Sequence, residues 1–387
     1  MSHPGYHQRI CVLSSSTFSQ EGGIQQVTRM ILRCLRETWP GAPLDLFSLH
    51  DARSQGLCDS LNRMPGSAPI SYWPCGSSRT RFSSVTLRAL MSCKPGLVIV
   101  DHVHLSVIPW LARRFASFPM VTMVHYAELW TLGFLRRQAL RQSDLIIAVS
   151  EFTKQTTHRV LGANCSVKVC NLGLHPEYPQ WAESPQRTPD ALANRRPILV
   201  VGRMADQTRD KGHEALLRAM PDVARRVPEA LLVIVGRGPD QSRLRDLSSE
   251  LGIQSHVHFA GFVPGQQLPA YYEAAEVFAM PSNSEGFGLV YLEAMYHSKP
   301  CIAGDRDGAR EVVRNGETGL LVEPGNVDQL RDALLQLLLD RETAQKLGAA
   351  GRTRLQQYFT YDHFAERLRE DLSPFLATTP QPSVSRA

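Results

Sequence analysis

The sequence predicts an α/β protein with two domains, each built on a doubly wound parallel sheet. Apolar, strand-like runs alternate with amphipathic segments along most of the 387 residues, a pattern typical of such sheets. Several runs are apolar throughout, as strands buried on both faces are. A segment rich in proline and polar residues, 176–197, separates two such series. We therefore expect two Rossmann-like domains joined by this linker, with a cleft between the carboxyl edges of their sheets.

The first series spans residues 1–175 and is the expected N-terminal domain. A glycine-marked loop enters an amphipathic helix within 19–37, and the segment 143–162 is typical of a strand, a serine cap and a helix. The other strand-like runs are 9–16, 44–50, 95–104, 119–126 and 166–174.

The second series spans 198–358 and is the expected C-terminal domain. Its strand-like runs are 196–204, 230–238, 257–263, 276–282 and 299–304. Helical periodicity is expected in 211–227, 241–252, 267–275, a helix from Leu289, and one long helix over 327–357. A C-terminal amphipathic helix, 359–376, is expected to pack back on the N-terminal domain, and 377–387 to be a disordered tail.

Composition indicates a globular protein, with 43% apolar and 20% charged residues. No apolar run approaches the ~20 residues that a membrane span needs, and the first ten residues lack the apolar core of a signal peptide. The eight cysteines form no C-x-x-C pair and no Cys/His metal spacing. We therefore expect a reduced, cytoplasmic setting and no metal site.

The positive charge is concentrated in the first half of the chain. Residues 1–175 contain 18 Lys/Arg against 9 Asp/Glu, whereas the remainder contains 24 against 28. Arginines at 113–114, 136–137 and 141 interleave with aromatic and aliphatic residues. Such a surface suits peripheral contact with an anionic membrane, at the inner face of the cell membrane; the alternative is a solvated basic face. No nucleic-acid-binding motif is present, and we expect no nucleic-acid partner.

Two carboxylates eight residues apart, Glu285 and Glu293, are the most informative feature of the sequence. Glu285 follows an apolar strand-like run, glycines at 286 and 288 mark a turn, and Glu293 falls within the helix that follows. The helix N-terminus between them offers free backbone N–H groups to an anion. A ligand with hydroxyls at its ends and phosphates in its middle, such as a nucleotide sugar, fits this order.

Cations follow the first strand of the second series. Gly202 and Arg203 end this strand and Lys211 begins the next helix, a placement that suits a diphosphate. Arg209 competes with Lys211 for the same role, because the loop between Arg203 and Lys211 is long. Two ordinary surface cations are the alternative.

Two further features mark the first half. Gly22 and Gly23 open the helix after the first strand, where backbone N–H groups can meet phosphate or a sugar hydroxyl. His125 ends an apolar strand, where it could hold a substrate hydroxyl or share a proton. A plain tight turn and a structural histidine are the alternatives.

Taken together, Gly22-Gly23, His125, the Arg203–Lys211 pair and the E-x₇-E segment resemble a retaining, nucleotide-sugar glycosyltransferase of the GT-B fold, in glycosyltransferase family four, group 1 type. The segments VGRM, LLVIVGRG, VHFAGFV, MPSNSEGFGLVYLEAM and GETGLLVEPGN occur in the family's order. The resemblance covers most of the chain and is dense only in the second half.

The resemblance implies a role for each candidate residue. Arg203 and Lys211 would hold the donor diphosphate, Glu293 the ribose hydroxyls, and His125 would contact the sugar near the reacting carbon. Glu285 would hold the transferred sugar and phosphate with backbone N–H groups near Phe287, Gly288 and Leu289. Gly23, beside Gly22, would approach the diphosphate or the acceptor, and Phe262 and Val263 would wall the base pocket.

The resemblance also implies an activity: transfer of a hexose from a UDP- or GDP-sugar to a saccharide or lipid-linked saccharide, with retention, in cell-surface polysaccharide or glycolipid synthesis. It implies no permanently bound cofactor and no required metal. The alternatives are a GT-B-fold phosphorylase or epimerase, or a non-catalytic sugar-nucleotide-binding protein. Two departures from the family pattern stand out, namely the long Arg203–Lys211 loop and Asp307-Gly308-Ala309 where the family usually has Gly-Gly before an acidic residue.

Overall fold

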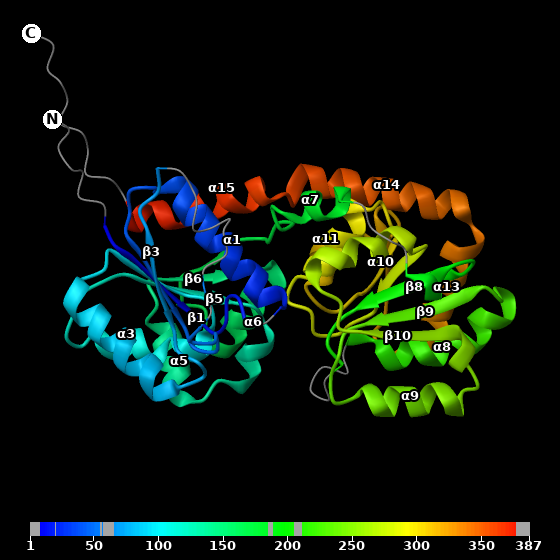
Figure 1. Ribbon diagram of the computed structural model, residues 1–387, viewed down its shortest axis with the longest axis horizontal. Coiled ribbons are helices and arrows are strands. Elements are labelled where there is room, and N and C mark those ends of the chain that lie inside the picture. The colour runs from blue at the N-terminus through cyan, green and yellow to red at the C-terminus, as the bar shows by residue number, and fades with distance from the viewer. Residues whose placement is uncertain are drawn as a thin grey trace, which may run out of the picture. The chain divides into compact units, whose positions relative to one another are not determined.

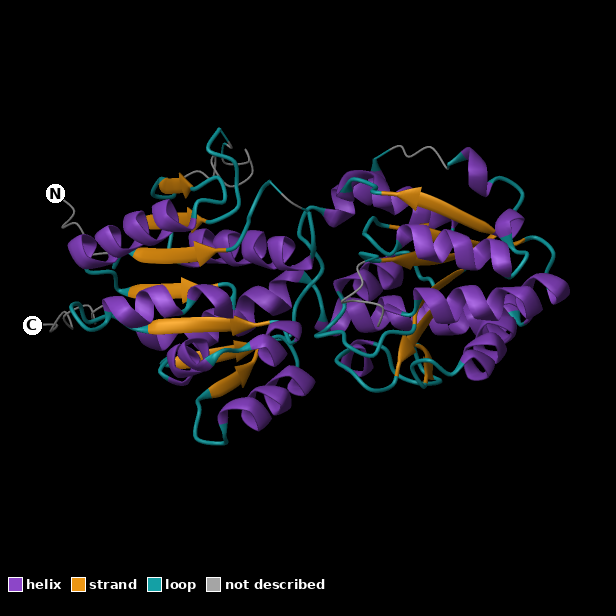
Figure 2. Cartoon of the chain, turned by 90° about the horizontal axis from the view of Figure 1, so that it is seen from below, coloured by secondary structure: helices purple, strands orange, loops and turns teal. Residues whose placement is uncertain are grey.

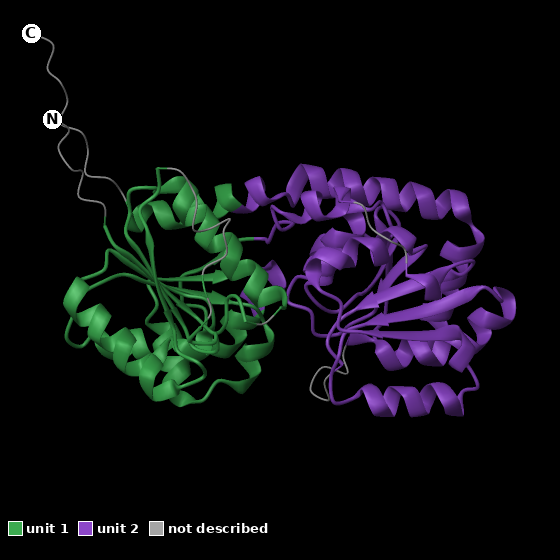
Figure 3. Ribbon diagram, viewed as in Figure 1, with its two compact units in different colours: residues 1–148, 156–170, 365–387 green, residues 149–155, 171–364 purple. Residues whose placement is uncertain are grey.

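The computed structural model describes residues 8–19, 21–54, 56, 66–184, 189–204 and 211–376. Within them the chain forms one seven-stranded and one six-stranded sheet, in two compact units (Figure 3). Unit 1 comprises residues 1–148, 156–170 and 365–387, and unit 2 comprises 149–155 and 171–364. Neighbouring strands pair in parallel in both sheets, so the predicted α/β class is confirmed. The expected tail, 377–387, lies outside the described residues.

The unit 1 sheet changes direction between its first and fourth strands. Its order is β3 (Ile70–Pro74), β2 (Leu44–Ser48), β1 (Ile10–Ser14), β4 (Leu97–Val100), β5 (Met120–Val124), β6 (Leu145–Ala148) and β7 (Val167–Val169). The chain therefore proceeds from β1 towards β3 on one side and from β4 towards β7 on the other. Figure 2 shows the strand arrows of this sheet running in one direction between helices.

Helices cover both faces of the unit 1 sheet. On one side lie α1 (Gly23–Thr38) and α15 (Tyr361–Leu372), and on the other α3 (Arg79–Cys93) and α5 (Phe134–Arg141) (Figure 1). Between α3 and α5 packs α4 (Val107–Ala112). In α1 the buried residues Val27, Met30, Ile31 and Leu35 recur at helical spacing, which fixes the face turned to the sheet. Further elements are η1 (Val103–Leu105), η2 (Ala127–Thr131), α6 (Glu151–Leu161) and η7 (Ser373–Phe375).

The unit 2 sheet has the same kind of reversal. Its order is β10 (Val257–Gly261), β9 (Ala230–Val235), β8 (Arg196–Val201), β11 (Val277–Met280), β12 (Cys301–Gly304) and β13 (Gly319–Val322). The direction changes between β8 and β11. Its helices are α7 (Tyr178–Glu183), α8 (His213–Arg226), α9 (Gln241–Glu250), α10 (Leu268–Ala274), α11 (Leu289–Tyr296), α12 (Ala309–Val312), α13 (Val327–Leu339) and α14 (Arg341–Tyr358), with short turns η3 (Asp190–Leu192), η5 (Gln254–His256) and η6 (Gly265–Gln267).

The structure corrects one expectation about elements. The single helix expected over 327–357 is wrong, because Asp340 leaves helical geometry and its side chain accepts the backbone N–H of Thr343, ending α13 and capping α14. The segment 176–197, expected as a linker, contains α7 and η3. The elements β3, α3, α4, α5, α12 and β13 were among those not anticipated. Within the described residues, no helix combines the length and apolar character needed to cross a bilayer.

Candidate active site

The reversal between β8 and β11 brings a cation and a carboxylate together in unit 2. Ligands of open α/β sheets bind outside the carboxyl ends of strands at such a switch point. Lys211 precedes α8, and its Nζ forms an ion pair with Glu285, which follows β11. Each side chain is only 19% exposed, so the pair is less screened than a surface ion pair. Two candidates that are 74 residues apart in the sequence thus lie in direct contact.

The other candidate cations occupy different positions. Gly202 and Arg203 follow β8, and the Arg203 side chain is exposed at the same carboxyl edge. Arg209 lies outside the described residues. Among the described residues, Lys211 is the candidate phosphate cation that contacts Glu285. Phe262 and Val263 follow β10 at the sheet edge, with Phe262 47% exposed and Val263 buried.

The loop between Glu285 and α11 requires glycine at its last position. Gly288 has φ +94°, and a Cβ there would lie 2.4 Å from the Tyr291 ring, so a side chain is excluded by both conformation and space. Phe287 is 1% exposed, and its ring packs edge-on against Phe359. Leu289 is also buried. These residues therefore present backbone N–H groups, rather than side chains, at the start of α11.

Glu293 is held inside unit 2 by a tyrosine that the sequence analysis did not single out. The carboxylate is 4% exposed and accepts a 2.7 Å hydrogen bond from the hydroxyl of Tyr272, on α10. Burial and the nearby Glu293 raise the pKa of Tyr272 well above its ordinary value, so the hydroxyl stays protonated and donates. The Tyr272 ring stacks on His297, with centroids 6.0 Å apart. Tyr272 thus fixes the orientation of Glu293.

Asp307, between β12 and α12, holds the Glu285 loop in place. Its Oδ2 accepts from the Ser282 hydroxyl and from the backbone N–H of Glu285, both at 2.7 Å, and its Oδ1 accepts from Ala309 N–H at 2.9 Å. Burial raises the pKa of Asp307 to about 6, against the opposing effect of these donors. At Gly308, a Cβ would lie 2.1 Å from a carbonyl oxygen of the loop. The Asp-Gly sequence that departs from the family pattern therefore packs tightly against the loop.

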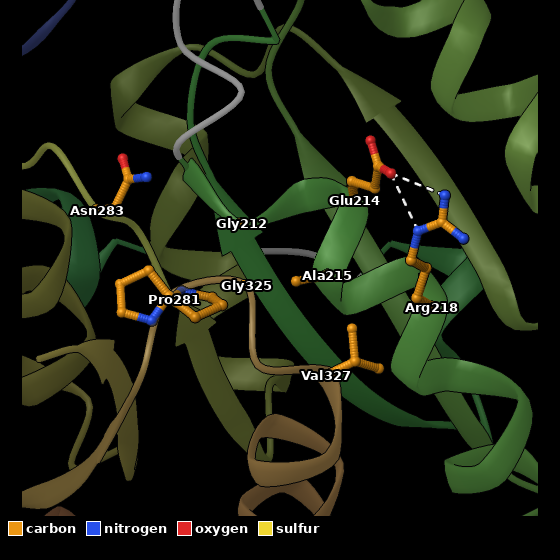
Figure 4. Close-up of a pocket in the computed structure, with 9 residues that line it drawn as sticks. Gly212, Glu214, Ala215, Arg218, Pro281, Asn283, Gly325 and Val327 are labelled. Atoms are coloured by element: carbon orange, nitrogen blue, oxygen red, sulfur yellow. Dashed lines mark hydrogen bonds and ion pairs between the residues drawn. The ribbon is translucent and has the colours of Figure 1, made fainter.

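A pocket of about 340 Å³ opens beside this loop. It is lined by the start of α8, by Pro281 and Asn283 after β11, and by the loop after β13 (Figure 4). Glu214 and Arg218 form an ion pair along one wall. Gly212, at φ +83°, lies so close that a Cβ would be 2.6 Å from the Pro281 ring. The carboxyl edge of unit 2 therefore has open volume next to Lys211.

In unit 1 the glycine pair lies where the sequence analysis expects it, at the start of α1. Gly22 is the N-cap residue and Gly23 is the first helical residue. The preceding loop is held by the buried carboxylate of Asp51, which accepts backbone N–H groups of residues 17–19 at 3.0–3.2 Å and the Tyr72 hydroxyl at 2.6 Å. Although burial opposes it, these donors lower the pKa of Asp51. Asp51, missed from sequence, thus orders the approach to the pair.

His125 follows β5, at the carboxyl edge of the unit 1 sheet. Its ring Nε2 lies 2.8 Å from the carbonyl oxygen of Asp101, and its backbone N–H donates to Glu128. The next residue, Tyr126, has φ +104°, a conformation that non-glycine residues rarely adopt and that clusters at functional sites. The structure therefore presents His125 on a strained turn in unit 1.

Two family models match the chain, one in its first half and one in its second half. Residues 21–178 match the model described as Glycosyltransferase Family 4, and residues 186–354 match Glycosyl transferases group 1. The GDP-mannose-dependent alpha-(1-6)-phosphatidylinositol monomannoside mannosyltransferase of Mycobacterium tuberculosis is 34% identical over 278 residues, covering 67% of this chain and 71% of that protein. A monoacylated-substrate counterpart from Corynebacterium glutamicum is 30% identical, covering 68% and 72%.

The fold has a close counterpart among solved structures. Sucrose-phosphate synthase from Thermosynechococcus elongatus superposes with a TM-score of 0.78 over 96% of this chain and 100% of that one, at 22% identity. At this identity the likeness concerns the fold, which agrees with the two parallel-sheet units. From the family matches and the relatives, the chain belongs to the group 1 glycosyltransferases of family 4 and is a nucleotide-sugar-dependent glycosyltransferase of the GT-B fold.

Proposed function

We propose that this enzyme transfers mannose from GDP-mannose to a phosphatidylinositol-based glycolipid. The observation that carries the proposal is the activity named for the relatives from M. tuberculosis and C. glutamicum, which align with two thirds of the chain. The E-x₇-E segment and the Lys211–Glu285 pair are compatible with this donor, because they offer groups for ribose, diphosphate and hexose in that order. Unit 2 binds the donor in this proposal, and unit 1 binds the acceptor.

Electrostatics is the main contribution of the proposed site. Lys211 has three N–H groups, so it can keep its contact with Glu285 while donating to a donor phosphate. Arg203 and the backbone N–H groups that begin α11 add positive potential where the leaving nucleotide gains charge. These groups offset the diphosphate charge without a metal ion. Glu293, oriented by Tyr272, accepts from the ribose hydroxyls, while Glu285 positions the hexose.

Transfer retains the anomeric configuration in this proposal. The acceptor hydroxyl attacks from the face that the nucleotide leaves, the anomeric carbon–oxygen bond to the phosphate breaks, and the departing phosphate takes the acceptor proton. Analysis of the product anomer by NMR tests this step. An α-mannoside from GDP-α-mannose supports retention, and a β-mannoside refutes it.

The donor and acceptor are tested with radiolabelled GDP-mannose and UDP-glucose, offered with phosphatidylinositol monomannoside in detergent micelles. Label passes to the lipid from GDP-mannose in the wild type, and Glu285→Gln lowers the rate while Glu250→Gln, an exposed glutamate at the end of α9, leaves it near wild type. Transfer only from UDP-glucose would refute the donor. Transfer only to a water-soluble saccharide would refute the lipid acceptor.

We also propose that unit 1 contacts the membrane that holds the acceptor. Large apolar side chains are exposed beside arginines on neighbouring elements, forming what we term the apolar–basic patch: Leu111, Arg113, Arg114, Phe115, Trp130, Phe134, Leu135, Arg136 and Arg137. Phe115 and Phe134 are 79% and 73% exposed. Because α4 and α5 pack against each other, exposed apolar residues on and beside these helices can insert at a lipid interface while exposed arginines such as Arg137 meet anionic headgroups.

Vesicle sedimentation tests the membrane contact. The wild type is expected to bind vesicles containing phosphatidylinositol or phosphatidylglycerol at low salt and to release at high salt. Phe134→Ser with Leu135→Ser should reduce binding, whereas Leu339→Ser, an exposed leucine of α13, should not. Equal binding by all three proteins would place the contact elsewhere.

A further inference from the structure

Three potential metal ligands converge in unit 1, away from the residues considered above. They are Cys11 in β1, Asp45 in β2 and Cys93 at the end of α3, and their ligand atoms all lie within 4.8 Å of one another. We call them the Cys11–Asp45–Cys93 cluster. Among the described residues, this is the single group of three His, Cys, Asp or Glu side chains that meets so closely.

The cluster follows from the register of the sheet. Cys11 and Asp45 are direct partners in the parallel β1–β2 pair, so their side chains point to the same face. Helix α3 packs on that face, and its last residue, Cys93, supplies the third ligand atom of the group. The Cys11 thiol lies 3.9 Å from Asp45 Oδ2. Because both strands have just begun at these residues, the cluster lies at the amino edge, opposite the edge that carries Gly22 and His125.

We propose that the Cys11–Asp45–Cys93 cluster binds a zinc ion. Two thiolates and one carboxylate are ligands that Zn²⁺ accepts in tetrahedral geometry, with the fourth position left to water. A tetrahedral zinc–thiolate site spaces its donor atoms at about 3.5–4 Å, given zinc–sulfur bonds of about 2.3 Å. The separations within the cluster need little adjustment to reach this spacing.

The charges of the cluster suit a divalent cation. The guanidinium of Arg9 bonds both Asp45 oxygens, at 2.9 and 3.0 Å, which leaves other lone pairs of the carboxylate available and orients it as outer ligands of metal sites commonly do. Two thiolates, a carboxylate and one guanidinium sum to two negative charges, equal and opposite to Zn²⁺.

The exposure of Cys93 offers the metal ion a route into the cluster. Cys11 is fully buried and Asp45 nearly so, whereas Cys93 is partly exposed. The bound ion would link β1, β2 and α3, and transferase activity would not depend on it directly.

Cobalt titration of the reduced, chelator-treated full chain tests the proposal, because Co²⁺ reports tetrahedral thiolate ligation in its absorption spectrum. We expect one equivalent to give thiolate-to-cobalt charge-transfer bands and intense visible bands, both removed by Zn²⁺. Cys93→Ser should abolish the bands and Asp45→Asn should weaken affinity at least tenfold. Cys165→Ser, a partly buried cysteine outside the cluster, should behave as the wild type.

A thermal readout separates a bound ion from a spectroscopic artefact. Zn²⁺ should raise the Tm of the wild type and of Cys165→Ser, and leave that of Cys93→Ser unchanged. The proposal is overturned if the wild type shows no cobalt bands, or if Cys93→Ser retains them while folded. A Cys11–Cys93 disulfide in the unreduced protein, with no metal uptake after reduction, would also overturn it, in favour of a redox pair. None of these outcomes depends on the identity of the sugar donor.

Discussion

Replacing Tyr272 by phenylalanine isolates the hydrogen bond that orients Glu293. The substitution removes one oxygen atom and keeps the ring that stacks on His297 and lies 5.7 Å from Phe278. The removed hydroxyl donates at 2.7 Å to a carboxylate that is 4% exposed. Hydrogen bonds to charged groups contribute about 1.5–3 kcal/mol, so we expect the free energy of unfolding to fall by about that amount.

The same substitution should weaken donor binding. A carboxylate that no longer has its orienting donor must be repositioned when ribose binds, and a cost of about 1.4 kcal/mol corresponds to a tenfold rise in Kd. Isothermal titration with GDP measures Kd, and steady-state kinetics should show a raised donor KM with kcat changed much less. Tyr271→Phe is the matched control, with the same atom removed one residue away. A folded Tyr272→Phe enzyme with wild-type Kd for GDP would refute the role of this contact.

Three further predictions concern the loop, its support and the start of α8. Glu285→Gln should lower kcat roughly 100-fold, as loss of one preorganised electrostatic group does, whereas Glu250→Gln should have a kcat near wild type; equal kcat values for the two variants would contradict this. Since the pKa of Asp307 is raised to about 6, its protonation below that pH turns an acceptor into a donor opposite Ser282, so kcat should fall as pH drops through 6. Asp307→Asn should have a low kcat at pH 8, and its kcat should no longer fall as the pH drops through 6. If the fall in kcat below pH 6 persists in this variant, another group causes it. Burial lowers the pKa of His213 from 6.5 to about 4, so the unfolded chain binds more protons between these values, and stability should be lost as pH falls from 6.5 to 4, by about 3 kcal/mol. Chemical denaturation of His213→Asn should show a correspondingly shallower pH dependence, and an unchanged slope would refute the assignment.

The parts of the fold that could be predicted from sequence are those with an unbroken local pattern. The predominantly apolar runs at 97–100, 120–124 and 230–235 are buried strands in the structure, because both faces of a parallel sheet are covered. The edge strand β3 alternates buried and more exposed residues, so the apolar-run criterion missed it. The break between α13 and α14 depends on the conformation of Asp340 alone. The sequence does not reveal this break, because the apolar pattern continues through both helices.

The candidate site residues also divide into those that a local sequence pattern reveals and those that only long-range contacts bring together. Glu285 and Glu293 could be found because strand end, glycine turn and helix lie in one short segment. The residues that hold these two glutamates in place could not be found from sequence. Tyr272 reaches Glu293 across 21 residues, and Asp307 reaches the Glu285 N–H across 22. No local sequence pattern encodes such a contact. The Cys11–Asp45–Cys93 cluster was missed for the same reason. Spacing rules for metal sites look for ligands close in sequence, whereas strand register and a helix end bring these three together.

Nucleotide binding to the Glu285–Glu293 segment is the central claim, and calorimetric titration of the wild type and Glu293→Gln with GDP and UDP tests it most directly. Glutamine can still accept the Tyr272 hydrogen bond, so the fold should be retained while an acceptor for the ribose hydroxyls is lost. The wild type should bind GDP and should bind UDP more weakly, Glu293→Gln should lose at least tenfold in affinity for GDP, and Glu250→Gln should bind GDP as the wild type does. Failure of the wild type to bind either nucleotide, or equal affinity in Glu293→Gln, would contradict it.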